Sequence, residues 1–399
     1  MRFRVREPAL LLALAFAPAL AQDSSPTFHG DNQRTGRTLN SGPTVPRLRW
    51  SFRTTAPIEA SPVTASDGMV FVASTDGKLC ALTPEGSPKW TFAAQEAAFG
   101  TPAIAADGSV LFADLAGRVY AVGTDGILRW SYAIEDGPNE RRVIAPPLAL
   151  PTGQSVFASW NDRIYSIGPD GRLVWRLSLD GAGQISAAPA LDPAGKIYVA
   201  AHDTADKRRL AVYKLDPGVG AQIWKFAEDM GIDRNRVISS PAIDPDRERL
   251  YVAIARENDG VVFAVSLTDG TRVLRAALPK GVISSPALGW DGTVYVGCMD
   301  GSLYALDPAS GSIRWQFATG AYYVLSSPTV DGAGNIFFGD SEGYIHALSP
   351  AGKGIWRLST GSAISSSPVI GSDGTLYVTS QNSMIYAYSQ RRRQSGRLR

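Results

Sequence analysis

The sequence predicts an all-β fold: a single eight-bladed β-propeller of four-stranded antiparallel blades, in which the N-terminal strand closes the last blade. Three observations carry this prediction. One pattern recurs eight times at spacings of about 40 to 50 residues. Each copy holds four short β-rich runs separated by turn signals, which is the period of a propeller blade. One residue of the pattern, a tryptophan, also occurs once before the first complete copy, as Trp50.

The recurrence is visible when two neighbouring stretches are compared. Residues 281–315 read GVISSPALGWDGTVYVGCMDGSLYALDPASGSIRW, and residues 323–356 read YVLSSPTVDGAGNIFFGDSEGYIHALSPAGKGIW. Each copy has a proline after small residues and a later β-rich run such as LYAL or IHAL. The prolines are Pro62, Pro102, Pro147, Pro189, Pro241, Pro286, Pro328 and Pro368. The repeat therefore makes one domain of the chain, without an internal linker.

A second anchor is the pattern Gly-x-x-x-Trp, in which an aromatic residue follows a turn. A degenerate copy has Leu274 after Gly270, and Trp50 has Pro46 in the glycine place. We expect each tryptophan to pack between neighbouring blades, against a glycine that lets the backbone come close. The predicted structural tryptophans are Trp50, Trp90, Trp130, Trp175, Trp224, Trp315 and Trp356.

The order of the anchors predicts how the ring closes. Trp50 precedes the first anchor proline, Pro62, whereas the last copy ends at MIYAYS with no tryptophan after it. The N-terminal RLRWSF strand should therefore supply the outer strand of the last blade, which leaves no exposed edge between the two ends of the array. Asp-Gly pairs recur regularly and are interpreted as hairpin turns.

The first residues have the composition of a secretory signal peptide. Three arginines precede an apolar run, Ala9–Ala21, which closes on a small-x-small site before Gln22. Thirteen residues reach only ~20 Å as a helix, too short to span a bilayer. We expect residues 1–21 to be a cleaved signal, 22–46 a leader, 47–389 the propeller and 390–399 a basic disordered tail. No cysteine follows the cleavage site, so the prediction is a periplasmic or secreted protein without a lipid anchor.

Charge and hydropathy exclude some partners. Without the signal, 36 basic and 36 acidic residues remain, and the tail RRRQSGRLR holds five of the arginines. The body before the tail is thus about five units negative, which disfavours nucleic acid. No later stretch is apolar and long enough to be a transmembrane segment. We expect a monomer.

The blade motifs resemble a known family. The stretch ALDPASGSIRW (305–315) resembles the tryptophan-docking motif of quinoprotein dehydrogenases, and SSPAL…DGTVYVG…DGSLYALD is similar to the PQQ-like propeller repeat. FHGDNQRTGR (28–37) also resembles the leader that often precedes such propellers. The resemblance runs from Phe28 to about Ser389. It implies the propeller fold, but the family includes both quinone-dependent dehydrogenases and a scaffold subunit of the bacterial outer-membrane assembly machinery.

The hypothesis of a quinone-dependent enzyme requires site residues that this sequence does not supply. Quinoprotein dehydrogenases hold a quinone at the propeller axis beside Ca²⁺ and a catalytic Asp, and no such acidic set aligns here. The two cysteines, Cys80 and Cys298, fall in blades three steps apart, too far for a disulfide, and are expected to be buried thiols. The three histidines are scattered, and Glu59 is the one carboxylate placed near the start of an inner strand. We predict no catalytic residue, no metal and no cofactor.

The repeats differ from one another mainly in the loops of blades 3 to 5. The loops before Pro147 and Pro241 are long and alike, each with Glu-Asp and then an Arg before Val-Ile. The corresponding position in each blade faces one rim, and its polar or aromatic occupants are the candidate binding residues: Arg142, Gln184, Arg236 and Tyr323. The arginines either hold an anionic group at the channel mouth or pair with the acidic residues of their own loops.

Two functions follow. The first is an exported, non-catalytic propeller that binds a protein partner or a small anionic ligand through its loop-rich rim at blades 3–5. The alternative is an oxidoreductase that depends on pyrroloquinoline quinone with calcium, or a remnant that still binds the quinone. The absence of paired catalytic residues in the sequence favours the first.

Overall fold

The computed structural model describes residues 24–134, 142–179, 185–202, 209–229, 239–256 and 259–391. The expected signal peptide and nearly all of the basic tail lie outside these ranges. The described chain is built of strands, with one 3-10 helix, η1 (Pro245–Arg247). None of its helices is long and apolar enough to cross a membrane.

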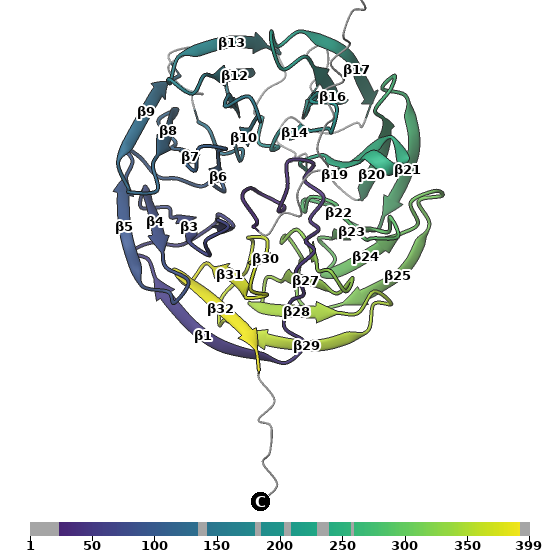
Figure 1. Cartoon of the computed structure of the whole chain (residues 1–399). Helices are drawn as coiled ribbons and strands as arrows, with labels where there is room; N and C mark the ends of the chain where they lie inside the picture. The colour runs from purple at the N-terminus through teal and green to yellow at the C-terminus, as the bar shows by residue number, and fades with distance from the viewer. Residues whose placement is uncertain are drawn as a thin grey trace, which may run out of the picture.

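The strands form eight separate four-stranded antiparallel sheets arranged in a ring, which confirms the predicted eight-bladed propeller (Figure 1). In blades 1 to 7, strands follow one another from the axis outward. Blades 1 and 2 are β2 (Val63–Thr64), β3 (Val70–Ala73), β4 (Lys78–Leu82), β5 (Pro88–Ala93) and β6 (Ala103–Ile104), β7 (Val110–Ala113), β8 (Arg118–Val122), β9 (Leu128–Ala133). Blades 3 and 4 are β10 (Leu148–Ala149), β11 (Ser155–Ala158), β12 (Arg163–Ile167), β13 (Leu173–Ser178) and β14 (Ala190–Leu191), β15 (Ile197–His202), β16 (Arg209–Leu215), β17 (Gln222–Asp229).

The remaining blades have the same order, except for the last. Blades 5 and 6 are β18 (Ala242–Asp244), β19 (Arg249–Ala255), β20 (Gly260–Ser266), β21 (Arg272–Leu278) and β22 (Ala287–Leu288), β23 (Val294–Gly297), β24 (Ser302–Leu306), β25 (Ile313–Ala318). Blade 7 is β26 (Thr329–Val330), β27 (Ile336–Gly339), β28 (Tyr344–Leu348), β29 (Gly354–Ser359). Blade 8 is β30 (Val369–Ile370), β31 (Leu376–Ser380), β32 (Met384–Gln390) and, outermost, β1 (Pro46–Arg53).

The N-terminal strand closes the ring as predicted. β1 pairs antiparallel with β32 from Pro46 opposite Gln390 to Arg53 opposite Met384. The two ends of the repeat array thus share one blade, and the edge strand that an open array would expose is paired.

The core lies between the blades. Second and third strands are mostly buried, as in β3 and β24, because each sheet is covered on both faces by its neighbours. One cluster joins Tyr198 of blade 4 to Ile243 and Val252 of blade 5. The outer strands instead alternate between exposed and half-buried residues, as in β25 and β29.

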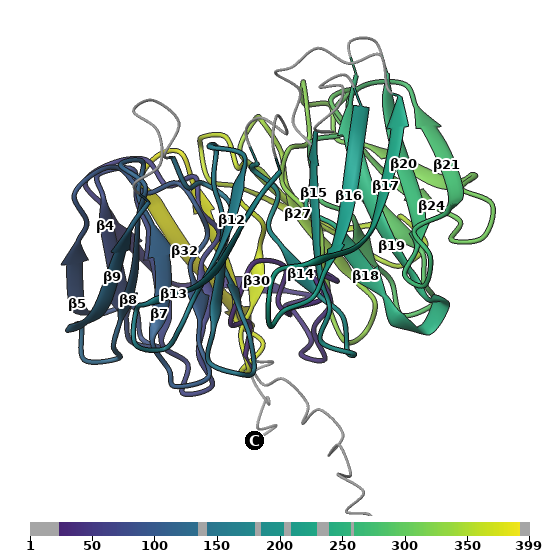
Figure 2. The same ribbon diagram turned by 90° about the horizontal axis from the view of Figure 1, so that it is seen from above.

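The ring has two different faces. Loops that enter the first strand of each blade lie on one face together with the turns between second and third strands; we call this the rim face. The turns between first and second strands lie on the opposite face, because antiparallel neighbours reverse direction at each turn. We call this second face the leader face, since the leader (24–41) runs across it (Figures 1 and 2). Figure 2 views the ring from its edge.

Candidate functional site

The leader is tied to the blades around the axis. Its backbone carbonyl groups accept hydrogen bonds from amides of six first strands in chain order. The pairs are Thr64 N to Ser25 O (2.9 Å), Ile104 N to Pro26 O (2.7 Å), Leu191 N to Asn32 O (2.8 Å), Ile243 N to Gln33 O (2.9 Å), Leu288 N to Thr35 O (2.8 Å) and Val330 N to Gly36 O (2.7 Å). The leader therefore crosses the leader-face end of the axis.

Hydroxyl groups next to the anchor prolines link the blades around the axis. The amide of Ser61 donates to Thr101 Oγ1 at 3.0 Å, and the amide of Ser240 donates to Ser285 Oγ at 3.1 Å. Further links run from Ala188 N to Ser240 Oγ, from Ser285 N to Ser327 Oγ and from Ser367 N to Ser61 Oγ. We call these links the hydroxyl belt. Five hydroxyl groups of the belt thus each satisfy a buried backbone donor of a neighbouring blade, namely those of Ser61, Thr101, Ser240, Ser285 and Ser327.

The hydroxyl belt is interrupted at blade 3. Pro146 and Ala188 occupy the belt positions of blades 3 and 4, and proline has neither an amide hydrogen nor a hydroxyl group. Arg34 of the leader joins these two blades instead. Its Nη2 donates to the carbonyl oxygen of Pro147 at 2.9 Å, and its Nε donates to that of Pro189 at 3.0 Å.

Arg34 is fully buried, which lowers the pKa of its guanidinium to about 9 by desolvation. Nη1 donates to Thr27 Oγ1 and, at 2.9 Å, to the carbonyl oxygen of Phe28. All three guanidinium nitrogens therefore have acceptors, which offsets the cost of burying the group. The resemblance of this segment to a propeller leader did not indicate that one of its side chains enters the axis.

Small hydroxyl side chains also line an axial cavity of about 190 Å³, where Phe28 of the leader joins serines from blades 1, 4, 5, 6, 7 and 8. Glu59 is the one charged residue among the described residues that line it. Ser365 Oγ donates to Glu59 Oε2 at 2.7 Å, and Gln381 Nε2 donates to Oε1 at 3.1 Å. The carboxylate is thus already held by neighbouring side chains.

The glycine of the recurring Gly-x-x-x-Trp pattern has a direct geometric role. Each docking tryptophan except the last packs against the turn glycine of the next blade. A Cβ added to Gly86 would lie 2.4 Å from Trp50 Cδ2, and one added to Gly220 would lie 2.5 Å from Trp175 Cε3. Trp50 Nε1 also donates to the carbonyl oxygen of Pro84 in that turn at 2.9 Å. Gly126, Gly171, Gly270 and Gly352 contact Trp90, Trp130, Trp224 and Trp315 in the same way.

Two members of the set differ for reasons that the structure explains. Leu274 takes the tryptophan place against Gly311, so the turn carbonyl of Pro308 has no indole donor; Arg249 Nη1 donates to it at 2.9 Å instead. Trp356 faces blade 8, whose outer strand comes from the other end of the chain. Its Nε1 donates to the carbonyl oxygen of Pro43, between the leader and β1, at 2.8 Å.

Of the four predicted rim residues, Gln184 and Arg236 lie outside the described residues. Arg142 is exposed at the rim of blade 3, and its guanidinium carbon lies 5.4 Å from the centre of the Trp160 ring. Trp160 N and Ser159 Oγ both donate to the carbonyl oxygen of Arg142, at 3.0 and 3.2 Å. The side chain thus stacks on an aromatic ring, an arrangement that neither prediction for it included. The acidic residues of its own loop, Glu135 and Asp136, are not among the described residues.

Tyr323 lies on the same face but not beside Arg142. It belongs to the entry loop of blade 7, four blades from blade 3 in a ring of eight, and therefore lies across the axis. Its ring is 39% exposed, and that of Tyr322 is 81% exposed. The backbone of Tyr323 bonds to Ser341, so the loop is fixed although the rings are open to solvent.

The two cysteines are free and buried. Burial raises the pKa of both thiols, that of Cys298 to about 11. Because the reactive form is the thiolate, both are poor nucleophiles near neutral pH. Among the described residues, no three His, Cys, Asp or Glu side chains lie together as a group that could hold a metal ion.

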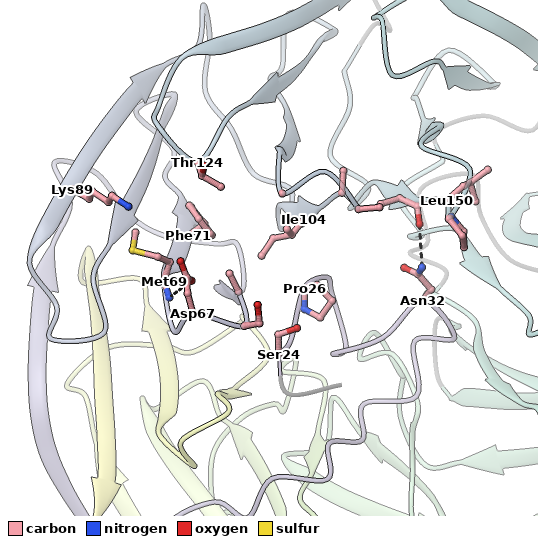
Figure 3. A pocket seen from close by; sticks show the side chains of 17 residues that line it. Ser24, Pro26, Asn32, Asp67, Met69, Phe71, Lys89, Ile104, Thr124 and Leu150 are labelled. Carbon is pink, nitrogen blue, oxygen red and sulfur yellow. Dashed lines mark hydrogen bonds between the residues drawn. The ribbon is translucent and has the colours of Figure 1, made fainter. Parts of the chain in front are cut away.

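The leader face carries two cavities. Figure 3 shows the first, about 570 Å³, in which Ser24 and Pro26 of the leader face Ile104, Met69 and Phe71 of blades 1 and 2. Asn32 marks its boundary and donates from Nδ2 to the carbonyl oxygen of Ala149 at 3.0 Å. The second cavity, about 930 Å³, shares Ser24, Asn32, Leu150 and Pro151 with the first. The two cavities therefore adjoin at the leader.

The repeat, the tryptophan docking and the closed ring define the chain as a PQQ-like β-propeller. A family model described as outer membrane protein assembly factor BamB matches residues 35–168, 160–321 and 208–398, so the chain belongs to this family. No curated protein matches the sequence.

Solved structures share the fold. The crystal structure of BamB from Moraxella catarrhalis is similar with a TM-score of 0.71 and 20% identity, covering 86% of this chain and 100% of that one. Quinohemoprotein alcohol dehydrogenase from Comamonas testosteroni has a TM-score of 0.74 and 14% identity, with 94% and 82% covered. A europium-containing methanol dehydrogenase has a TM-score of 0.70 and 14% identity, with 89% of each chain covered. The fold is thus shared by an assembly factor and by dehydrogenases.

The described axis does not fit the quinone of the dehydrogenase relatives. Pyrroloquinoline quinone is a rigid tricarboxylate, and sites for ligands of that size usually have volumes of roughly 300–1,000 Å³. The axial cavity holds about 190 Å³, and the described residues that line it include no lysine or arginine to meet carboxylates. Glu59, the one acidic lining residue, is already bonded to Ser365 and Gln381.

Proposed function

We propose that this protein is an exported, non-catalytic β-propeller that acts as a binding scaffold for a partner protein through the rim face of blades 3–5. The observation that carries the proposal is the use of the axial polar groups. In PQQ-like dehydrogenases, by the resemblance stated above, the axis holds the cofactor. Here the axial hydroxyls link blades, Glu59 is held by its neighbours, and Arg34 closes the gap at blade 3.

The rim face offers what a protein partner needs. Arg142 is exposed, and its guanidinium carbon lies 5.4 Å from the centre of the Trp160 ring. A guanidinium that stacks on an aromatic face keeps its in-plane N–H donors available. Arginine and tryptophan are the residue types most enriched at energetically important interface positions. An acidic side chain of a partner would complement this pair. Membership of the family described as an assembly factor supports a scaffold role, and the expected signal peptide supports export to the periplasm or beyond.

Site-specific photo-crosslinking in the native host tests the proposal. Benzoyl-phenylalanine in place of Trp160 reports on the rim face, and the same residue in place of Val219, 70% exposed at the turn before β17, is the matched control. The proposal predicts a discrete protein adduct at Trp160 that is absent at Val219. It also predicts a clear loss of adduct when Arg142→Glu is added and little loss with Arg129→Glu, an exposed arginine near the leader-face end of β9. Equal adducts at both positions, or none at Trp160, would contradict a scaffold role of this rim.

A further inference from the structure

The larger cavity of the leader face has the features of a small-molecule site. It has a volume of about 930 Å³, within the roughly 300–1,000 Å³ range of ligand pockets. The leader forms one wall, and the turns after β10 and β14 form the other. Since these turns join first and second strands, the cavity opens on the face opposite Arg142 and is separate from the rim proposed above.

Most of the cavity wall is apolar, and part of it is open to solvent. Trp290 from the turn after β22 is 45% exposed, and Leu39 of the leader is 58% exposed. Leu150, Pro151 and Pro193 complete the apolar surface. Trp290 is held in place because its Nε1 donates to the carbonyl oxygen of Asp331 at 2.8 Å. Exposed apolar side chains gathered in a hollow commonly mark a binding site.

The two acidic residues of the wall are occupied by the fold itself. Thr35 donates to both carboxylate oxygens of Asp31, from its amide at 2.9 Å and from its hydroxyl group. The carboxylate of Asp192 accepts from the amide of Lys196 at 2.7 Å and from the hydroxyl of Tyr198 at 2.9 Å. Neither carboxylate is left to recruit a cationic ligand.

Arg37 is the opposite case. Its guanidinium carbon lies 5.0 Å from the centre of the Trp290 ring. Within the described part of the chain its side chain has no hydrogen bond, but its charge acts on Asp31, where it opposes the rise in pKa that burial causes. Stacking on an indole orients a guanidinium while leaving its in-plane N–H donors available. The wall therefore presents one cation whose hydrogen-bond donors have no acceptor within the described chain, beside an aromatic and aliphatic surface.

We propose that this cavity binds a small amphiphilic carboxylate. The carboxylate pairs with the donors of Arg37, because a guanidinium and a carboxylate match in charge and in bidentate geometry. The apolar chain lies against Trp290, Leu39 and the prolines of the two turns. This arrangement selects an anionic head over a neutral or cationic head of the same chain length, because Arg37 is the only charged side chain of the wall without a hydrogen-bond partner within the described chain.

Titration calorimetry with three ten-carbon probes tests the site: decanoate, 1-decanol and decylammonium, each below its micelle concentration. Decanoate should bind the wild-type protein most tightly, and tryptophan fluorescence should change on binding but not in Trp290→Phe. Loss of a charge-assisted hydrogen bond weakens binding roughly tenfold or more, so Arg37→Gln should weaken decanoate binding by that factor and leave decanol unchanged. Leu39→Glu, which places a carboxylate at an exposed position of the wall, should weaken decanoate selectively.

The matched control is Arg357→Gln, since Arg357 also stacks on an aromatic ring, 4.8 Å from the centre of Tyr344, in a different blade. It should bind decanoate as the wild type does, and all variants should melt at the wild-type temperature. The site is refuted if the three probes bind equally, if Arg37→Gln binds decanoate unchanged, or if decanoate does not bind at millimolar concentration. None of these outcomes bears on the rim of blades 3–5.

Discussion

Arg34 Nε donates a hydrogen bond to the carbonyl oxygen of Pro189, which lies 155 residues away in the chain, at 3.0 Å. The same guanidinium reaches Pro147 in the adjacent blade. These are the blades in which Pro146 and Ala188 replace the hydroxyl-bearing residues of the hydroxyl belt. One side chain of the leader thus replaces a link that the repeat itself lacks, and it does so at the axis where dehydrogenase relatives are expected to bind their cofactor.

Removal of this link should destabilise the whole propeller. Arg34→Met leaves the buried carbonyl oxygens of Pro147 and Pro189 without this donor, and also the partly buried one of Phe28. We expect the free energy of unfolding to fall by about 3 kcal/mol. Denaturant unfolding followed by circular dichroism measures the change. The control is Arg129→Met, which removes an exposed ion pair with Asp125 and should cost no more than about 0.5 kcal/mol. Equal losses of unfolding free energy in the two variants would show that the hydrogen bonds of Arg34 stabilise the propeller no more than an exposed ion pair does.

The docking of tryptophan on glycine can be separated from backbone strain. Gly86 and Gly361 both have a left-handed backbone, with φ of 83° and 82°, so alanine is strained at either position. Only at Gly86 would the new methyl group also meet an indole, that of Trp50; nothing lies within 4 Å of the site at Gly361. Gly86→Ala should therefore lower the free energy of unfolding by at least about 1 kcal/mol more than Gly361→Ala, which is the usual cost of overpacking. A difference near zero would mean that the indole moves aside freely.

The leader should also give the protein a specific sensitivity to acid. His29 is buried against Phe28, its Nδ1 lies 3.1 Å from the carbonyl oxygen of Arg34, and its Nε2 has no hydrogen-bond partner among the described residues. Burial lowers the pKa of this histidine from 6.5 to about 4. The folded state therefore binds the proton less tightly than the unfolded chain. Its contribution to stability is complete above pH 6.5 and is lost as the pH falls towards 4.

This loss is tested by comparing the wild type with His29→Asn, since asparagine tolerates the left-handed backbone found at this position. The shift in pKa corresponds to about 3 kcal/mol at the acidic limit. Unfolding free energies measured at intervals from pH 7.5 to 4 should fall more steeply for the wild type, by up to that amount. Parallel curves for the two proteins would rule out His29 as the source of acid sensitivity.

The ring was predictable because its signals are local and repeated. Eight anchor prolines gave the number of blades, and the position of Trp50 before Pro62 indicated that β1 belongs to the last blade. Arg34 carries no such signal, since its acceptors are backbone carbonyls of distant blades. The replacement of a belt hydroxyl by Pro146 and Ala188 is a sequence feature that could have pointed to a missing link there.

The candidate sites were less predictable because, like the contacts of Arg34, they depend on side chains that do not recur in the repeat. Arg142 was selected by alignment of the repeats, but Trp160, which orients it, lies in a turn of the same blade and has no counterpart in the docking pattern. Arg37 and Trp290 come from the leader and from blade 6, and their stacking depends on the path of the leader across the leader face. Side-chain pairs formed between non-repeating segments leave no periodic trace in a sequence.

We propose that the polar groups at the axis of this propeller serve to link its blades and that the protein acts by binding a partner. The most direct measurement is a titration of the purified mature protein with pyrroloquinoline quinone and Ca²⁺, followed by absorption spectroscopy and by reduction of an electron-accepting dye with alcohols and sugars as substrates. The account predicts no saturable change in the quinone spectrum and no dye reduction above a protein-free control. Stoichiometric binding of the quinone with turnover of the dye would contradict it and would make this protein a small quinone-dependent dehydrogenase.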